Sequence, residues 1–426
     1  MKHCVLGMAM LAALLMGSPV WGAGLWLYEI GSPDVGTAAA GRAAMASDAS
    51  AAGTNPAGMT KLDRSQMLAA LQGLYVNAKF DTELSGFGGG DGGNAGGFVP
   101  TGSLHYVHRM TPDLSLGLSV GSYFGLGVDY GKDWAGRYYI TEADLLTFGV
   151  NPGIGYRIND RLSVGAGFSV MYAELKQKVA INNAAVPLQA GLADGELRLE
   201  DDDTAYGFNL GILLEPRPGT RFGITYRSEV DLEFEDVAGV SGIGPVLQGL
   251  FATTGLAGSQ VDLKMTVPQA VMVSGYHQVT PRWAIVGNIG WQEWSKFGKQ
   301  EISLRSEQSR SFNQDLEYDD AWHFALGAQF RFAPEWLWSF GAAYDTSPVD
   351  SDKGRTPDLA LDRQIRLASG LQYDWNEDVT IGAAYEYIDL GDGGINRNDG
   401  PLKGPLKGDY DPNAIHVFAL NLIWKF

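Results

Sequence analysis

The C-terminal residues 414–426 constrain the fold more than any other part of the chain. Every second residue from Phe418 to Phe426 is large and apolar. These side chains share one face of a β-strand, because successive side chains point to opposite faces. An edge strand of a soluble β-sandwich could carry such a row. A transmembrane β-barrel places the row against lipid and has aromatic residues at its rims, so we expect a barrel strand here.

The other end of the chain has the features of a secretory signal. A short basic start, residues 1–3, precedes an apolar run over residues 5–16 that is too short to span a bilayer. Small residues near position 22 predict cleavage after Gly22 or Ala23, so residues 1–22 are expected to be a signal peptide. The only cysteine, Cys4, lies ahead of the apolar run. We therefore expect no disulfide and no cysteine metal site in the mature chain.

Composition favours the same class of protein. The chain has 426 residues, of which 57 are glycine, and its net charge is −18. Beyond the signal, no apolar run approaches the roughly 18 residues that a transmembrane helix needs. The negative charge argues against nucleic acid as a partner. It suits a cell surface on which divalent cations bridge anionic lipopolysaccharide, so outer-membrane lipid and lipopolysaccharide are the expected surroundings.

About fourteen segments have the character of strands. In one of them, Phe222 and Ile224 alternate with Arg221 and Arg227, which fits apolar side chains toward lipid and polar ones toward water. A soluble sandwich also alternates, so alternation alone leaves both folds open. The segments are approximately 66–81, 99–111, 114–130, 143–159, 162–181, 196–215, 220–236, 259–280, 283–303, 311–333, 336–349, 365–376, 379–391 and 414–426.

The connections between these segments decide between the two folds. Short turns of two to four residues, such as 159–161 and 280–282, alternate along the chain with much longer connections, such as 182–195 and 237–258. Tight periplasmic turns and long outer loops are typical of an up-and-down barrel. The sequence therefore predicts an all-β, up-and-down antiparallel transmembrane barrel over residues 65–426, with both termini on the periplasmic side.

Residues 23–64 lie between the signal and the first strand and are rich in Ala and Gly. A stretch of this length cannot build a core of its own. It could be a free periplasmic tail, although such tails are more often polar and disordered. Because small residues allow close packing, we expect a small N-terminal hatch that plugs the barrel lumen.

Residues 55–60, Asn-Pro-Ala-Gly-Met-Thr, follow the Ala-rich stretch and Asp48. Together these features resemble the N-terminal hatch of the FadL-type outer-membrane transporters of hydrophobic compounds. The stretches 283–297 and 340–349 also resemble strands of that family, and the resemblance covers the whole mature chain. It implies passive uptake of long-chain fatty acids, or of aromatic or aliphatic hydrocarbons, across the outer membrane of a Gram-negative cell.

The resemblance implies that a ligand first lands on outer loops. The connection 237–258 offers apolar residues that would share one side of a helical turn. These residues are Val246, Leu247, Leu250 and Phe251. Packing of this connection against the neighbouring one at 182–195 is an equally open explanation of its apolar character.

The resemblance also implies a lumen pocket and a sideways exit into the membrane. The hatch would close the pocket and shift to open a path, and its candidate residues are Asn55, Pro56, Ala57, Gly58 and Met59. The exit would be a kink in the third strand, where glycines at 121, 125 and 127 permit a bend. Its candidate residues are Tyr123, Phe124, Gly125 and Gly127.

One departure from the family concerns charge. Fatty-acid carriers are expected to offer a cation to the ligand carboxylate, yet the matching positions on the fifth and tenth strands include Glu174 and Asp319. A carboxylate that faces these residues is repelled or forced to protonate. Lys176, Lys178 and Arg137 are possible substitutes. The choice between a fatty acid and a neutral hydrocarbon therefore stays open.

No enzyme is predicted. The chain has six histidines but no Gly-x-Ser-x-Gly motif, and the glycine-rich stretch 86–93 lacks the residues of a phosphate-binding loop. We expect no catalytic residue, no metal and no cofactor.

The protein is expected to be a monomer that engages the barrel assembly machinery through its C-terminal Phe426. A general diffusion porin, which would lack a hatch, and a surface receptor or adhesin are the alternatives.

Overall fold

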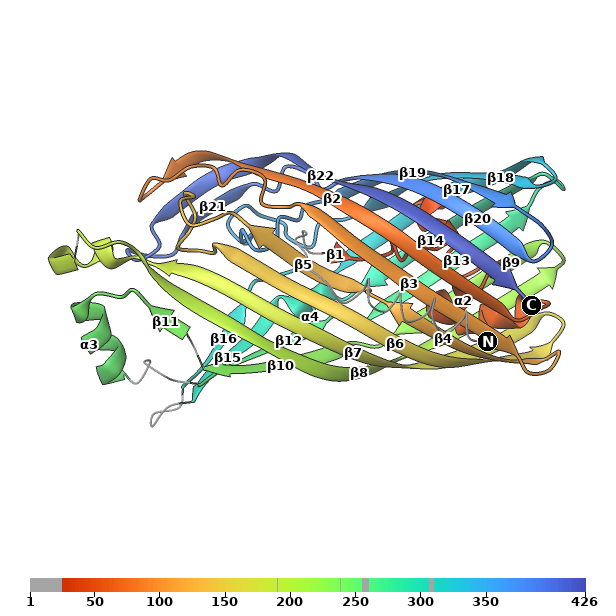
Figure 1. Ribbon diagram of the computed structural model, residues 1–426, viewed down its shortest axis with the longest axis horizontal. Coiled ribbons are helices and arrows are strands. Elements are labelled where there is room, and N and C mark those ends of the chain that lie inside the picture. The colour runs from red at the N-terminus through yellow and green to blue at the C-terminus, as the bar shows by residue number, and fades with distance from the viewer. Residues whose placement is uncertain (1–24, 190, 238, 255–259, 306–309) are drawn as a thin grey trace, which may run out of the picture.

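The protein is a closed antiparallel barrel of 14 strands (Figure 1). The computed structural model describes residues 25–189, 191–237, 239–254, 260–305 and 310–426, so the expected signal peptide lies outside the described residues. The last wall strand closes the barrel by pairing with the first. In chain order the wall consists of β2 (Gln66–Ser85), β3 (Phe98–Arg109), β4 (Leu114–Gly121) with β5 (Phe124–Asp129), β6 (Glu142–Asn159), β7 (Leu162–Ile181), β8 (Gly195–Arg217), β9 (Thr220–Arg227) with β10 (Val230–Val237), β12 (Gln260–Val267) with β13 (Ala270–Gln278), β14 (Trp283–Gln292) with β15 (Lys299–Arg305), β16 (Arg310–Asp315) with β17 (Ala321–Ala333), β18 (Trp336–Asp345), β19 (Gln364–Asp374), β20 (Val379–Asp389) and β22 (Pro405–Lys425).

The C-terminal strand shows which face of the wall meets the membrane. Phe418 and Leu420 are 54% and 61% exposed, whereas the alternating residues Val417 and Ala419 are buried. A soluble sandwich would bury the row of large apolar side chains instead. Exposed apolar side chains recur around the wall, for example at Phe168, Phe208, Leu326 and Leu367. An apolar outer face on a closed barrel confirms the predicted fold class.

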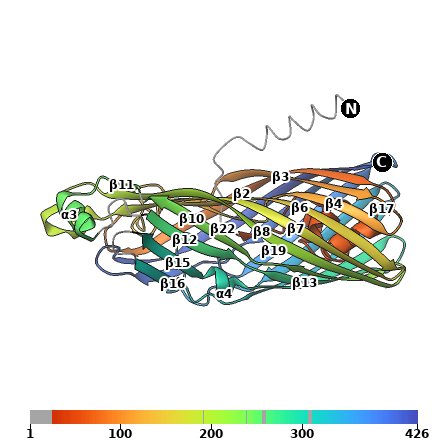
Figure 2. The ribbon, with the colours of Figure 1, turned by 90° about the horizontal axis from the view of Figure 1, so that it is seen from below.

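The two ends of the barrel differ (Figure 2). The C-terminus and the tight turns share one end, where aromatic rings pair, such as Trp283 with Phe330 and Trp336 with Tyr373 at centroid distances of 4.3 and 4.5 Å. Aromatic belts of this kind are typical of a membrane interface. The other end carries the long loops, which include η3 (Asn183–Ala185), η4 (Pro187–Gln189), β11 (Gly239–Ser241), α3 (Pro245–Thr254) and β21 (Ile395–Asn398). No helix among the described residues is long and apolar enough to cross a membrane.

Four consecutive wall strands break at one level. β9, β13, β14 and β17 belong to the main sheet, while their outer continuations β10, β12, β15 and β16 form a separate four-stranded sheet. β12 and β13 part at Pro268, which has no N–H for the ladder. The short helix α4 (Trp294–Phe297) separates β14 from β15. The sequence predicted continuous strands at these places, because alternation resumes after each break.

Residues 25–64, called here the N-terminal segment, lie inside the barrel (Figure 1). They form β1 (Leu25–Trp26), η1 (Pro33–Thr37), α2 (Ala51–Thr54) and η2 (Pro56–Lys61). Wall glycines face the backbone of this segment: a Cβ on Gly165 would overlap Ala57, and a Cβ on Gly223 would overlap Ala43. Small residues on both sides therefore let the segment approach the wall closely enough to fill the lumen.

A buried cluster of charges joins the N-terminal segment to the wall. Arg366 on β19 donates to Glu29 of the segment and, over 2.8 Å, to Asp345 on β18. Asp345 also bonds the Nδ1 atom of His323 at 2.7 Å, and Glu386 Oε1 lies 3.9 Å from Arg366. All five side chains are buried, so Arg366 is the cation that offsets three carboxylates.

We expect Arg366→Met to destabilise the protein by about 3–5 kcal/mol, because three buried carboxylates lose their cation. The measurement is the temperature at which the folded barrel converts to its unfolded form on SDS gels. Arg363→Met is the matched control, since Arg363 pairs with Asp389 at the surface over 2.8 Å and such pairs contribute little. An unchanged conversion temperature in Arg366→Met would contradict a stabilising role for the cluster.

Candidate functional site

The third wall strand is interrupted between Gly121 and Phe124, where the sequence analysis expected a kink. Gly121 pairs with Gly149 of β6, and Gly125 pairs with Leu146 of β6. Between these two pairs the third strand advances by four residues while β6 advances by three. The extra residue makes a β-bulge, which bends a strand locally.

Beyond the bulge the third strand leaves β3. The pairing of β3 with β4 stops at Leu104 and Val120, and β5 then pairs with β1 of the N-terminal segment. Residues 98–103 of β3 keep hydrogen-bonded partners on β2. The hydrogen-bond ladder of the wall is therefore open between β3 and β5, and β1 lies along the β5 side of this opening.

Glycines at the opening provide space. Neither Gly121 nor Gly125 has a positive φ. A Cβ on Gly125 would meet only the carbonyl oxygen of Leu145, at 3.5 Å. A Cβ on Gly149 would lie 3.3 Å from the ring of Tyr123, so this glycine leaves room for the buried tyrosine.

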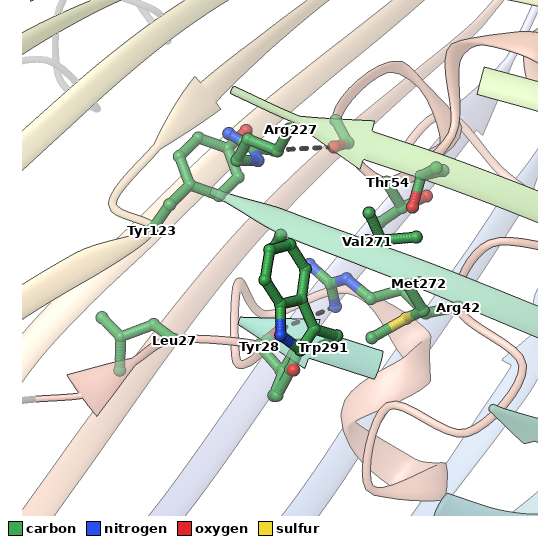
Figure 3. A pocket seen from close by; sticks show the side chains of 12 residues that line it. Leu27, Tyr28, Arg42, Thr54, Tyr123, Arg227, Val271, Met272 and Trp291 are labelled. Carbon is green, nitrogen blue, oxygen red and sulfur yellow. Dashed lines mark hydrogen bonds between the residues drawn. The ribbon is translucent and has the colours of Figure 1, made fainter. Parts of the chain in front are cut away.

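Two pockets meet at Tyr123, in the bulge beside the opening. The first, called here the hatch pocket, has an empty volume of about 490 Å³ between the N-terminal segment and the wall (Figure 3). Tyr28 and Thr54 line it from the segment, and Tyr123, Arg227 and Trp291 line it from the wall.

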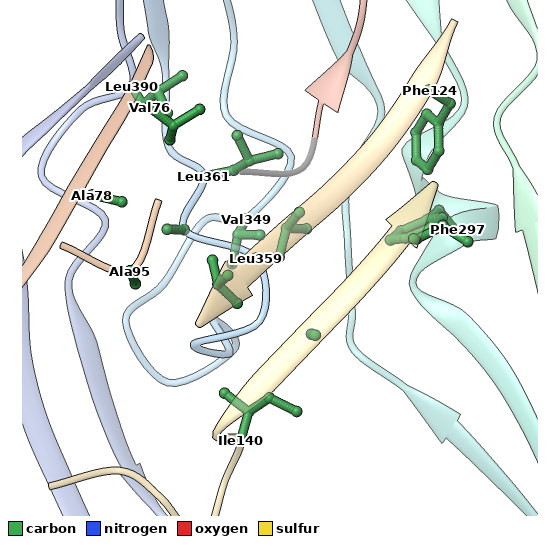
Figure 4. Packing of buried hydrophobic residues seen from close by; sticks show 14 of the residues in the cluster. Val76, Ala78, Ala95, Phe124, Ile140, Phe297, Val349, Leu359, Leu361 and Leu390 are labelled. Carbon is green, nitrogen blue, oxygen red and sulfur yellow. The ribbon is translucent and has the colours of Figure 1, made fainter. Parts of the chain in front are cut away.

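The second pocket, called here the lumen pocket, is a narrow space at the level where the four wall strands break. Its lining is mainly apolar and includes Phe124, Met171, Val230, Val267 and Pro268. The Phe124 ring also lies 5.9 Å from Trp294 and 5.4 Å from Phe297 of α4, between ring centroids (Figure 4). The inward bend of the third strand thus builds an aromatic cluster inside the barrel.

A third pocket, with an empty volume of about 780 Å³, lies among the outer loops. Ile140, Leu199 and Leu263 are among its apolar lining residues, and its polar lining includes Arg397 and Lys403. Nearer the lumen, loop residues Val349, Leu359 and Leu361 are buried in the same cluster as Val76 and Leu390 of the wall region (Figure 4). Outer loops therefore fold into the barrel mouth.

The candidate capture loop packs on its neighbour. The side-chain oxygen of Gln189 accepts from the N–H of Val246 at 2.8 Å, and Asn183 accepts from Gly244 at 2.9 Å. Leu247 is buried while Val246 is 44% exposed, so these two residues do not share one exposed face. The side chains of Leu250 and Phe251 lie outside the described residues. α3 stands at the tip of the long-loop end, away from the C-terminal end (Figures 1 and 2).

The candidate hatch residues fasten the N-terminal segment to the wall. Asn55 Nδ2 donates to the carbonyls of Ala43 at 2.6 Å and of Ile212 at 3.2 Å, and its Oδ1 accepts from Ala57 at 3.1 Å. Pro56 begins η2, where a missing N–H has no cost. Met59 is fully buried in a cluster between the segment and the wall, and Gly58 is buried beside it. None of the five candidates lines the hatch or lumen pocket; Gly53 and Thr54, immediately before them, do.

The expected acidic surroundings of a ligand are wrong. Glu174 is exposed on β7 on the same face as Phe168, which points to the membrane, and Asp319 is exposed in a connection. Lys176 and Lys178 share the face of Glu174 and both pair with Glu142. Arg137 is paired with Asp194 among the outer loops, at 2.8 Å. None of these residues lines the hatch or lumen pocket. The side-chain alternation of β7 turns Glu174, Lys176 and Lys178 outward, and Asp319 and Arg137 lie in connections between strands.

The cation that lines both pockets is Arg227, which no sequence motif singles out. Arg227 ends β9, and alternation with the exposed Phe222 and Ile224 places it on the inner face. Its Cζ atom lies 4.3 Å from the ring centroid of Tyr123. The alternation of residues in the sequence predicts that the Arg227 side chain points inward, but it does not predict the position of this side chain along the barrel axis.

Comparisons with known proteins agree with this architecture. A family model described as outer membrane protein transport protein (OMPP1/FadL/TodX) matches residues 13–426. The long-chain fatty acid transport protein of Escherichia coli O6:H1 is 31% identical over 358 residues, which cover 78% of each chain. Outer membrane protein P1 of Haemophilus influenzae is 26% identical over 360 residues, which cover 74% of this chain and 75% of that protein.

Two solved structures share the fold. A FadL homologue of Pseudomonas aeruginosa has a TM-score of 0.83 at 21% identity and covers 96% of this chain and 99% of its own. The toluene transporter TodX of Pseudomonas putida has a TM-score of 0.67 at 17% identity and covers 96% and 100%. Since the family model spans nearly the whole chain, this outer-membrane barrel belongs to the FadL/TodX family of transport proteins.

Proposed function

We propose that this protein carries hydrophobic small molecules, either long-chain fatty acids or aromatic or aliphatic hydrocarbons, passively across the outer membrane. The observation that carries the proposal is a pair of pockets inside a plugged barrel, both lined by Tyr123 at the bulge of the third strand, whose ladder with β3 is open beyond that point. Relatives named for fatty acid transport, and a structural neighbour named for toluene transport, support this ligand class. The protein acts as a transporter and performs no chemistry on its ligand.

The proposed route has three steps. A ligand is captured on the outer loops around α3, including Val246, Leu247, Leu250 and Phe251, and then passes to the lumen pocket. A shift of the N-terminal segment near residues 55–59 opens a path, and the ligand leaves sideways between β3 and β5. A sideways exit avoids water, in which an alkyl chain would lose about 0.8 kcal/mol of favourable burial per CH₂ group.

The remaining assignments follow the same proposal. Residues 1–22 are a signal peptide, residues 23–64 are the hatch, and residues 65–426 are the barrel. The protein is a monomer in a membrane that carries lipopolysaccharide, and its C-terminal Phe426 engages the barrel assembly machinery. A general diffusion porin needs an open, water-filled lumen, and the buried N-terminal segment argues against that alternative.

Uptake by cells that lack the protein tests the proposal. Such cells, with and without a plasmid copy, are given a radiolabelled long-chain fatty acid or radiolabelled toluene at low concentration. We expect the plasmid copy to raise uptake of at least one compound. If it raises neither, the transport proposal fails, and large ion conductance of the purified protein would favour a porin instead.

A further inference from the structure

The connection between β18 and β19, residues 346–363, is folded into the barrel mouth and is called here the mouth loop. Its residues Val349, Leu359 and Leu361 are buried in the same cluster as Val76 of β2 (Figure 4). Connections normally run over the surface of a protein, because a buried backbone needs hydrogen-bond partners. The mouth loop therefore depends on partners inside the barrel.

The wall and a neighbouring connection supply some of these partners. The hydroxyl of Tyr130, just after β5, donates to the carbonyl oxygen of Pro357 at 2.7 Å. Nδ2 of Asn413 in β22 donates to the carbonyl oxygen of Ala360 at 3.0 Å. The mouth loop is thus fastened from two separate parts of the barrel, and its position in the lumen is well determined.

Arg355 of the mouth loop is 3% exposed and joins three pieces of backbone. Its Nε donates to the carbonyl oxygen of Leu361 and its Nη1 to that of Gly394, both at 2.7 Å. Its Nη2 donates to the carbonyl oxygen of Val349 at 3.2 Å. Gly394 belongs to the connection after β20, so one guanidinium holds both ends of the mouth loop and its neighbour. Two carboxylates of the same loop offset its charge at 3.4 and 3.5 Å, those of Asp352 and Asp362.

The mouth loop reaches across the lumen toward the opposite wall. Its residues 356–358 line the third pocket together with Leu199 of β8 and Leu263 of β12. Along β7 the lumen pocket touches Met171, whereas the third pocket touches Gln177, further toward the long-loop end. The lumen pocket therefore lies between the N-terminal segment on one side and the mouth loop on the other.

We propose that the mouth loop is a second plug, which closes the outer end of the lumen to water-soluble solutes, and that Arg355 is the positioning residue that holds it in place. The N-terminal segment closes the other end, so the barrel stays sealed when one of the two plugs moves. The closure concerns hydrophilic solutes. It therefore stands or falls independently of the proposed transport of hydrophobic molecules.

A reporter cysteine in the lumen pocket tests the closure. Ser169 lines this pocket, is 5% exposed, and its hydroxyl has no hydrogen-bond partner among the described residues, so Ser169→Cys fits with little change. Intact cells that produce the full chain are treated with a membrane-impermeant maleimide. We expect Ser169→Cys to react about ten-fold or more slowly than Leu188→Cys, since Leu188 on the outer loops is 89% exposed. The native Cys4 lies in the expected signal peptide.

Removal of the arginine should open the mouth. In the Ser169→Cys background, we expect Arg355→Met to raise the labelling rate about ten-fold or more, because three carbonyls of a buried connection lose their donor. Arg355→Lys keeps the charge but not the planar set of donors, so it should give an intermediate rate. Asn413→Ala loosens the same loop from the wall and should raise the rate about three-fold or more. It tests the closure separately if Arg355→Met does not assemble.

Arg363→Met is the matched control. Arg363 ends the same loop but pairs with Asp389 at the surface over 2.8 Å, so its loss should leave the labelling rate unchanged. Conversion of each variant between folded and heated forms on SDS gels shows whether the barrel has assembled.

The outcomes separate the closure from the transport function. Unchanged labelling in both Arg355→Met and Asn413→Ala would overturn the second plug, as would a Ser169→Cys that reacts as fast as Leu188→Cys. An equal rise in Arg363→Met would remove the special role of Arg355. If the labelling results are as expected but the plasmid copy raises uptake of neither the fatty acid nor toluene, the second plug stands and the transport function falls.

Discussion

Uptake should fall to the level of cells lacking the protein when Gly125 is replaced by tryptophan, while the barrel stays folded. Phe124 lines the lumen pocket, so alternation turns the side chain at position 125 to the other face of β5. A Cβ there meets only the carbonyl oxygen of Leu145, at 3.5 Å, which leaves room for a larger side chain. The indole would fill the space beside the open ladder between β3 and β5. Uptake of a radiolabelled ligand, with assembly checked on SDS gels, is the measurement.

The same substitution at Gly275 is the control. Gly275 lies in β13, which is paired with β9 and β14 along its length, and a Cβ there would meet the ring of Phe222 at 3.9 Å. Gly275→Trp therefore adds the same bulk to a closed part of the wall and should transport normally. Normal uptake by Gly125→Trp would mean that the ligand does not leave at the third strand. Equal losses in both variants would mean that tryptophan impairs assembly.

The wall could be predicted from the sequence because its signals are local. The alternating residues of β22 and the short turns depend on neighbours a few positions apart. The breaks in four wall strands lacked such a signal, apart from Pro268. α4 is a clear example, because the mixture of aromatic and polar residues over 291–297 is equally compatible with a strand. The start of β22 at Pro405, ahead of the predicted residue 414, was likewise hidden in a polar stretch.

The site could be predicted only in part, because its residues meet through the closure of the barrel. The glycines near Tyr123 indicated the bend, but not that β1 would pair with β5 there. Alternation predicts that the Arg227 side chain points inward. It predicts neither the position of this side chain along the barrel axis nor its contact with Gly53. For Glu174 the prediction from the sequence was wrong. Its place in the sequence suggested a contact with the ligand, whereas its alternation with buried residues places its side chain on the outer face of the barrel.

A disulfide between the N-terminal segment and the wall should abolish transport reversibly. The hydroxyl oxygens of Thr60 in η2 and Ser163 in β7 lie 2.7 Å apart, so cysteines at both positions can approach the separation of a disulfide. The chain has one native cysteine, Cys4, within the expected signal peptide, so no other thiol should compete. We expect oxidised T60C/S163C to lose about ten-fold or more of its uptake and to regain it on reduction, because a pinned segment cannot shift.

The controls decide what the loss means. Each single cysteine variant should transport normally in both redox states. A pair within the wall, D374C/T380C, joins β19 to β20, where the native side chains lie 2.7 Å apart, without touching the N-terminal segment. It should form a disulfide and still transport, since the proposed movement belongs to the segment and not to the wall. Normal uptake by fully oxidised T60C/S163C would show that η2 stays in place during transport, and the moving part would then have to lie between β1 and α2, next to the hatch pocket.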